Sequence, residues 1–147
     1  MPELELSSSY LRELPTRLLA IAGVQANAAS RAALAAHDAT HFDFAILVTL
    51  ETWDDLSQAE LGRRTGINRK DVAETVAGLE RRGTVTRRAD PDNARRKLVS
   101  LSAKGRIWIE RLKVSVDQAQ AVFTENLSHD DVKALVSLLQ RLLSTPE

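Results

Sequence analysis

The spacing of apolar residues predicts helices toward both ends of the chain. From residue 9 to about residue 36 the sequence is rich in Leu and Ala at near-helical spacing, and Pro15 lies early enough to be a first-turn residue or a kink. The apolar run 43–50 predicts a short buried helix, with a strand as the alternative. Ser102 and Ser128 can each cap a further helix. The chain is therefore expected to be mainly helical.

Two short helices joined by a tight turn are predicted in the middle of the chain. Ser57 and Glu60 match a capping box, in which the Ser side chain bonds the Glu amide and the Glu side chain reaches back to the cap. Gly66 ends this helix by tolerating the left-handed conformation, and Asn68 caps the next one. The second helix then carries an apolar stripe of Val72, Val76 and Leu79. This arrangement is typical of a helix-turn-helix.

A hairpin is predicted directly after these helices. Residues 84–88 and 95–101 are β-prone, and the segment 89–94 between them contains the Asp, Pro and Asn that favour turns. The hairpin is the expected wing of a winged helix-turn-helix. Residues 42–102 are therefore predicted to form one lobe, with its functional part between Leu56 and Leu101.

The predicted last helix has an apolar face that a domain of this size cannot cover alone. That face consists of Val132, Leu135, Val136, Leu138, Leu139, Leu142 and Leu143. A second copy of the chain is the economical explanation. We expect one domain, residues 1–147, in which 1–36 and 103–147 supply long dimerisation helices.

The formal net charge is zero, but the charges are unevenly distributed. Residues 1–62 carry three Arg against nine acids, whereas residues 63–97 carry eleven Arg or Lys against five acids. The remaining residues balance. A charged, solvated surface is the alternative interpretation, but it does not explain neighbouring Arg pairs gathered in one stretch. A local positive field of this kind favours nucleic acid as the partner.

The outward face of the second helix is the candidate base-reading surface, because that helix of a helix-turn-helix lies in the major groove. Arg69 and Lys70 can bind guanine or phosphate, and Glu74 can accept from a cytosine amino group. Ala73 also points outward, and Asn68 with the helix N-terminus suits a phosphate. Ordinary solvated helix residues are the alternative for Ala73 and Glu74.

The other basic residues are candidates for phosphate neutralisation or for insertion of the wing into the minor groove. They are Arg63, Arg64, Arg87, Arg88, Arg95, Arg96 and Lys97. Solubility and charge protection of an edge strand are the alternative roles.

These segments together resemble the MarR family of regulators. The resemblance is carried by 61–68, by 79–85 and most specifically by the wing-to-helix segment 90–105, and it extends over nearly the whole chain. It implies a homodimer that binds a pseudo-palindromic operator in double-stranded DNA, usually as a repressor. It also implies a small-molecule effector, often phenolic or anionic, that binds between the dimerisation helices and the DNA-binding lobe.

The wing departs from the family pattern at one position. Family members usually carry Asp-x-Arg there, and the resemblance implies that the Arg enters the minor groove. In this chain the Arg is Arg95, but the Asp position holds Asn93. A neutral side chain is expected to orient Arg95 less firmly.

Several other functions are disfavoured by the sequence. The chain has no cysteine, which excludes disulfides and thiol chemistry, and it shows no nucleophile motif, P-loop or dinucleotide fingerprint, so we expect neither an enzyme nor a cofactor. No apolar run approaches the ~20 residues of a membrane span, and the acidic N-terminus is unlike a secretory signal. We therefore expect a cytoplasmic protein without a membrane partner.

Two alternative functions stay open. His37, Asp38 and His41 have a spacing compatible with one metal site, although polar loop residues or contributors to an organic-ligand pocket are the favoured interpretation. A winged-helix interaction module without DNA binding is the other alternative, because a fold alone does not fix a function.

Overall fold

The N-terminal helical region is interrupted at Pro15. A computed structural model of the protein describes residues 2–146. It contains α1 (Pro2–Leu6), α2 (Ser9–Arg12) and the long α3 (Pro15–Ala35), where the sequence predicted one helix from residue 9. Leu14 is extended at φ −82° and ψ 113°, because the residue before a proline is disfavoured in helical conformation. Pro15 is thus a first-turn residue of α3, which confirms the first of the two predicted alternatives, and the long helix begins there and not at residue 9.

Helix α4 (His41–Trp53) confirms the helical interpretation of the apolar run over the strand alternative. The Thr40 side chain accepts from the Asp43 amide, and the Asp43 carboxylate accepts from the Thr40 amide at 2.9 Å. This reciprocal cap fixes the start of the helix. Its buried side chains are Ile46, Leu47 and Leu50.

The predicted helix-turn-helix is confirmed as α5 (Gln58–Thr65) and α6 (Arg69–Arg81). Gly66 ends α5 in the left-handed region at φ 74°. A Cβ on Gly62 would lie 3.3 Å from the Ile67 carbonyl oxygen, so a small residue there keeps the turn tight. The Ser57 side chain accepts from the Glu60 amide at 3.2 Å, as predicted. The reciprocal bond is not formed, since the Glu60 carboxylate instead contacts Arg63 and Arg64.

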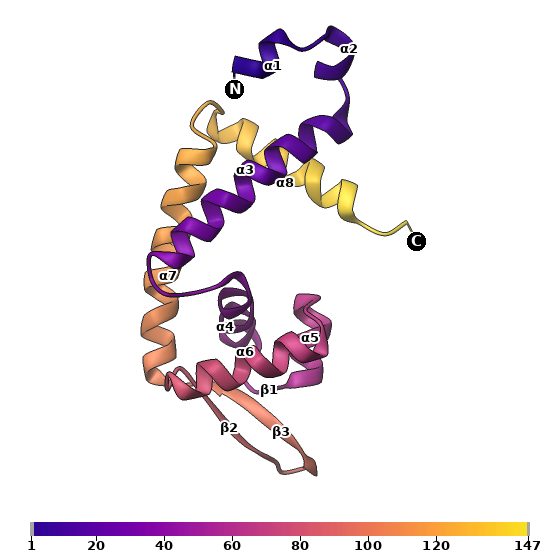
Figure 1. Ribbon diagram of the computed structural model, residues 1–147. Coiled ribbons are helices and arrows are strands. Elements are labelled where there is room, and N and C mark those ends of the chain that lie inside the picture. The colour runs from indigo at the N-terminus through magenta and orange to yellow at the C-terminus, as the bar shows by residue number, and fades with distance from the viewer. Residues whose placement is uncertain (1, 147) are drawn as a thin grey trace.

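The predicted hairpin is confirmed as β2 (Val85–Asp90) and β3 (Asn93–Leu101), and it projects beyond the helices (Figure 1). Its antiparallel register pairs Arg87 with Val99 and Arg88 with Leu98. A short strand that was not predicted, β1 (Leu56–Ser57), pairs with β3 and gives the sheet order β1-β3-β2. The fold is mainly α with a small β-sheet wing, as expected.

The C-terminal part consists of α7 (Ala103–Phe123) and α8 (His129–Leu143). Ser102 and Ser128 cap these helices through their side chains, as predicted. Helix α3 packs along α7, and the Ser115 hydroxyl donates to the Ala33 carbonyl at 2.8 Å. Figure 1 shows α7 rising from the base of the wing along one side of the lobe, with α3 beside its upper part.

One hydrophobic core joins the end of α3, the helices α4, α5 and α6, the sheet and the first half of α7. Its fully buried residues include Leu34, Ile46, Leu47, Leu50, Leu61, Val72, Val76, Leu79, Val85, Val99, Ile109 and Leu112. Helix α8, in contrast, has no buried residue within the described part of the chain. Its exposed apolar side chains include Leu135, Val136, Leu138, Leu142 and Leu143.

Helix α3 corrects the expectation that no apolar segment approaches the length of a membrane span. It has 21 residues and is apolar enough to cross a membrane by length and composition alone. A single helix of this kind is weak evidence for a span, and α3 packs along α7.

Candidate functional site

Helix α6 separates its side chains into a buried and an outward face. Val72, Val76 and Leu79 are almost fully buried against the core, as the stripe predicted. Arg69, Lys70 and Glu74 are exposed on the other side, and Ala73 is half-buried. Lys70 and Glu74 lie 3.9 Å apart as an exposed pair, which contributes little to stability. The charged groups of Arg69, Lys70 and Glu74 are therefore accessible to a partner.

Asn68 is occupied by the cap of α6. Its carbonyl oxygen accepts from the Asp71 amide at 2.9 Å, while its amide nitrogen donates to the Asp71 carboxylate at 2.6 Å. Both ends of the Asn68 side chain thus hold the start of the helix. The residue positions α6, and a phosphate contact would have to use the backbone or rearrange this cap.

A groove of about 740 Å³ lies between the start of α5, the α5–α6 turn and strand β3. Five cations line it, contributed by both helices and the wing: Arg63, Arg69, Arg95, Arg96 and Lys97. Among residues 2–146, Arg69, Arg95 and Lys97 form no salt bridge. The structure thus brings together basic residues that lie far apart in the sequence.

Carboxylates hold the other wing arginines. Glu80 at the end of α6 accepts from Arg87 Nε at 3.0 Å and from Arg87 Nη2 at 2.9 Å. This bond lowers the pKa of Glu80 and raises the pKa of Arg87. Arg88 donates to Asp55, which also accepts from the Ser100 hydroxyl. The Ser100 and Arg88 hydrogen bonds lower the pKa of Asp55.

The turn of the wing is built around Asp90, whose side chain is only 4% exposed. Its Oδ1 accepts from the Asp92 amide at 2.9 Å, and its Oδ2 accepts from Arg96 Nε at 2.9 Å. These bonds, the Asp92 amide first, lower the pKa of Asp90. Asn93 accepts from the Arg95 amide at 3.1 Å. Asn93 therefore fixes the backbone of Arg95, while the Arg95 guanidinium stays exposed.

Arg63 and Arg64 gather around Glu60. Both contact its carboxylate, Arg64 with Nε at 3.5 Å, and the Arg63 hydrogen bond is the main cause of the lowered pKa of Glu60. The Arg64 guanidinium also lies 4.2 Å from the centre of the Trp53 ring. Arg64 is thus directed toward α4, whereas Arg63 also lines the groove.

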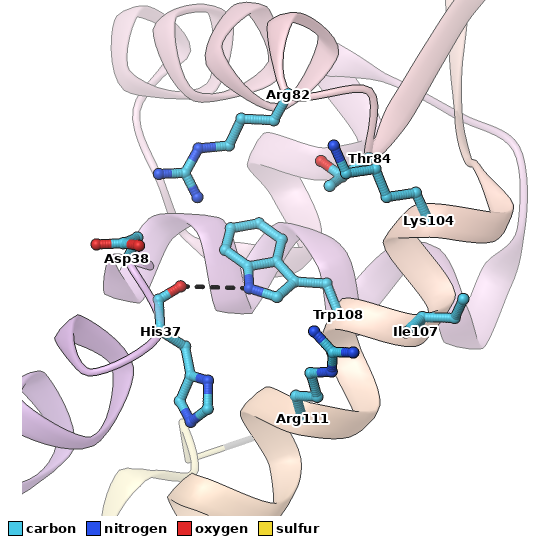
Figure 2. A pocket seen from close by; sticks show the side chains of 8 residues that line it. All are labelled: His37, Asp38, Arg82, Thr84, Lys104, Ile107, Trp108 and Arg111. Carbon is cyan, nitrogen blue, oxygen red and sulfur yellow. Dashed lines mark hydrogen bonds between the residues drawn. The ribbon is translucent and has the colours of Figure 1, made fainter.

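A second cavity, of about 610 Å³, lies where α3, α6 and α7 meet (Figure 2). Trp108 donates from its indole nitrogen to the His37 carbonyl at 3.3 Å, and the Arg82 guanidinium lies 4.8 Å from the Trp108 ring centre. Beside this cavity the end of α6 is tied to α7, since the Ser102 amide donates to the Thr84 carbonyl at 3.1 Å. The segment that follows α6 is thus hydrogen-bonded to the N-cap residue of α7.

A third cavity, of about 790 Å³, opens between α3, the start of α4 and α6. Asp38 and Arg82 line both this cavity and the second one. His41 lines the third cavity and His37 the second. Across residues 2–146, no three His, Asp or Glu side chains converge in a way that could hold a metal ion.

The sequence did not reveal the acidic partners of the wing or the role of Trp108. Asp55 and Arg88 lie 33 positions apart and meet only through the strand pairing. Neither Trp108 nor Arg82 had a predicted role. The contact between Glu80 and Arg87 could have been predicted, because the two residues lie only seven positions apart and a helix end followed by a strand can bring such residues together.

The family model and the relatives that match this chain all describe transcriptional regulators. A model of the MarR family matches residues 40–97. YdgJ of Bacillus subtilis, an uncharacterized helix-turn-helix-type transcriptional regulator, is 30% identical over 97 residues. That match covers 66% of this chain and 59% of the relative, so the chain matches less than two thirds of the relative's length.

Solved structures share the fold over most of the chain. A probable transcriptional regulator from Pseudomonas aeruginosa has a TM-score of 0.80 at 30% identity, covering 90% of this chain and 99% of that one. A mutant of MarR from E. coli, solved in complex with operator DNA, has a TM-score of 0.79 at 23% identity. The similarity covers 94% of this chain and 100% of the E. coli chain and shows a common fold.

Proposed function

The chain belongs to the MarR family of transcriptional regulators, and we propose that it is a sequence-specific regulator that binds double-stranded DNA as a homodimer. The groove between α5, α6 and the wing is the observation that carries this proposal. Within residues 2–146, three of its cations form no salt bridge, and one of them, Arg69, is the first residue of α6. In a helix-turn-helix, this end of the second helix contacts base edges. The E. coli structure of the same fold was solved with operator DNA.

The contacts divide into base reading and backbone positioning. Arg69 is exposed at the start of α6 and is proposed to read guanine O6 and N7, while Lys70 reads a neighbouring base or binds phosphate. Arg95 and Lys97 are proposed to act on phosphates or the minor groove from the wing. Arg87, Arg88 and Arg96 are proposed to shape the wing, because each is already paired with a carboxylate.

Dimerisation is proposed to use the exposed apolar side chains of α8 and neighbouring helices. Leu138 is 57% exposed and Val122 is 67% exposed. Apolar side chains that gather on one helix face and stay exposed favour an interface with another chain. A two-fold dimer would present two copies of α6 to a pseudo-palindromic operator and would usually repress transcription. A cytoplasmic location is part of the same proposal.

A small-molecule effector is proposed to act where the long helices meet the lobe. The two cavities beside Arg82 lie between α3 or α7 and the end of α6. A ligand there can release DNA only if it binds the conformation without DNA more tightly.

The test begins with selection of bound fragments from genomic DNA by the full chain. We expect one enriched palindromic sequence and a loss of preference at one base position per half-site for Arg69→Ala. The matched control is Arg106→Ala, which removes an exposed arginine from α7. No enrichment, together with no affinity for DNA at low salt, would instead identify a protein-interaction module.

A further inference from the structure

The wing is a hairpin whose own strands do not fix the direction in which it projects. Its third strand, β1, has two residues and meets β3 at Leu98 and Val99. A two-stranded hairpin is marginally stable by itself, and Figure 1 shows this one extending beyond the helices. Contacts at the base of the wing, where residues 85–88 pair with 98–101, therefore decide where its far end lies.

Asp55 contacts both strands of the wing at this base. It directly precedes β1, and its carboxylate accepts from the Ser100 hydroxyl in β3 and from Arg88 Nη2 in β2. Because the sheet order is β1-β3-β2, the Arg88 side chain crosses β3 to reach Asp55. Arg88 pairs with Leu98, two residues before Ser100, so both contacts lie on one face of the sheet. One carboxylate thus ties both strands to the segment between α4 and β1.

A second carboxylate holds the opposite face of the base. Arg87 precedes Arg88 in β2, and successive side chains of a strand point to opposite faces. On its own face Arg87 donates to Glu80 of α6, with Nε at 3.0 Å and Nη2 at 2.9 Å from the carboxylate oxygens. The base of the wing is therefore held by α6 on one face and by Asp55 on the other.

We propose that Asp55 is a positioning residue for DNA binding, which acts by fixing the direction of the wing and thus the place of Arg95. Arg95 lies beyond the held base, lines the groove between α5, α6 and β3, and forms no salt bridge within residues 2–146. The Asp55 carboxylate would repel a phosphate, so a favourable effect on DNA binding has to pass through the wing. This inference rests on the proposed function.

The sign of the effect separates positioning from simple electrostatics. Asp55→Asn removes a negative charge near the proposed DNA-binding surface, so a purely electrostatic effect would tighten binding. Loss of positioning would weaken binding, because the charge-assisted bond to Arg88 is gone and the wing populates other directions. The Asp55 and Arg88 side chains are 41% and 52% exposed, and such a pair contributes little to overall stability. The variant therefore stays folded, and its affinity for DNA reports on the wing.

The test is fluorescence anisotropy with the DNA sequence that the unmodified full chain selects. We expect Asp55→Asn to bind this DNA about three- to fivefold more weakly, as the loss of an exposed ion pair allows. Ser100→Ala removes the other hydrogen bond of Asp55 without changing a charge, and it should also weaken binding.

Asp54→Asn is the matched control. It removes the same charge from the neighbouring residue, which forms no salt bridge in the described part of the chain. Asp54 has a φ of 61°, and Asn is among the residues that adopt a positive φ most readily. Asp54→Asn should not weaken DNA binding.

Two further measurements follow the effect through the wing. In the Arg95→Ala background, Asp55→Asn should have a smaller effect on affinity, because the contact that Asp55 positions has been removed. In the free protein, Asp55→Asn should speed amide hydrogen exchange in β2 and β3 and leave exchange in α6 unchanged.

The inference is overturned if Asp55→Asn binds the selected DNA as tightly as the unmodified chain or more tightly, or if Asp54→Asn weakens binding equally. It is also overturned if the loss is the same with and without Arg95, or if exchange in β2 and β3 does not change. A full chain that binds no DNA would contradict the proposed function and this inference together. DNA binding that Arg95→Ala weakens and Asp55→Asn does not would contradict this inference alone.

Discussion

The Arg96 guanidinium lies against the carboxylate of Asp90, with Nε 2.9 Å and Nη2 2.7 Å from Oδ2. Both Arg96 and its neighbour Arg95 line the groove between α5, α6 and β3, but Arg95 makes no salt bridge within the described residues. Two adjacent arginines of the same strand thus have different surroundings. From this difference we propose that Arg96 stabilises the wing and that Arg95 contacts DNA.

Arg95→Ala and Arg96→Ala should therefore have different effects on DNA binding. We expect Arg95→Ala to weaken binding and to reduce the slope of log K against log salt by about 0.9, because one phosphate is no longer neutralised. Arg96→Ala should leave the slope nearly unchanged and lower the stability of the wing. Fluorescence anisotropy over a salt series measures both slopes. An equal reduction of slope in the two variants would contradict the division of roles.

The Asp90 carboxylate should make stability depend on pH. Its pKa is lowered in the folded protein by the Asp92 amide and Arg96, so the ionised form stabilises the fold. The contribution is present above the unfolded pKa, about 4, and is lost as pH falls through the lower folded pKa. Urea unfolding should give Asp90→Asn a lower free energy of unfolding than the unmodified chain near neutral pH. This difference in free energy should shrink as the pH falls into the acid range.

Asp92→Asn is the matched control for this experiment. It removes a carboxylate from an exposed residue of the same turn and keeps the backbone amide that bonds Asp90. We expect no comparable pH-dependent gap. A gap for Asp90→Asn that stays constant from neutral pH to acid would show that the carboxylate charge does not stabilise the wing.

Gly105→Ala should disrupt the connection between the wing and α7. A Cβ at this buried position would lie 2.1 Å from the Thr84 carbonyl oxygen, so the backbone would have to move. Overpacking of this kind costs about 1–3 kcal/mol or more. Gly78→Ala is the control, because its nearest neighbour is the flexible Arg81 side chain at 3.7 Å. Chemical denaturation should show a loss of stability for Gly105→Ala, and equal stability of both variants would refute the close approach.

Leu138→Asp should dissociate the proposed dimer without unfolding the lobe. The side chain is 57% exposed in the single chain, so a charge costs little there but is costly inside an apolar interface. Ser137→Asp places the same charge on the polar side of α8 and should keep the dimer. Sedimentation measures the mass of each variant. A monomeric unmodified chain, or a dimer that survives Leu138→Asp, would remove α8 from the interface.

Local signals in the sequence predicted most of the fold. Ser57, Asn68, Ser102 and Ser128 cap the predicted helices, because a cap depends on residues three positions apart. The two-residue strand β1 was missed, since it is too short to show periodicity. The predicted role of Glu60 in a full capping box failed because Arg63 and Arg64 compete for its carboxylate.

The sequence was enough to predict which basic residues make up the candidate site, but not which of them are paired with carboxylates. The excess of basic residues in 63–97 identified the region. Which of them are free depends on the register of β2 and β3 and on the contact of Asp55 with Arg88, and no local pattern encodes these. The cavity beside Trp108 likewise exists only once α3, α6 and α7 are brought together.

The affinity of the full chain for its selected DNA sequence, measured over a salt series beside a scrambled sequence, tests the central claim most directly. We predict tight binding at low salt, a linear fall of log K with log salt, and markedly weaker binding to the scrambled sequence. No binding at low salt, or equal affinity for both sequences at every salt concentration, would contradict the proposal of a sequence-specific DNA-binding regulator.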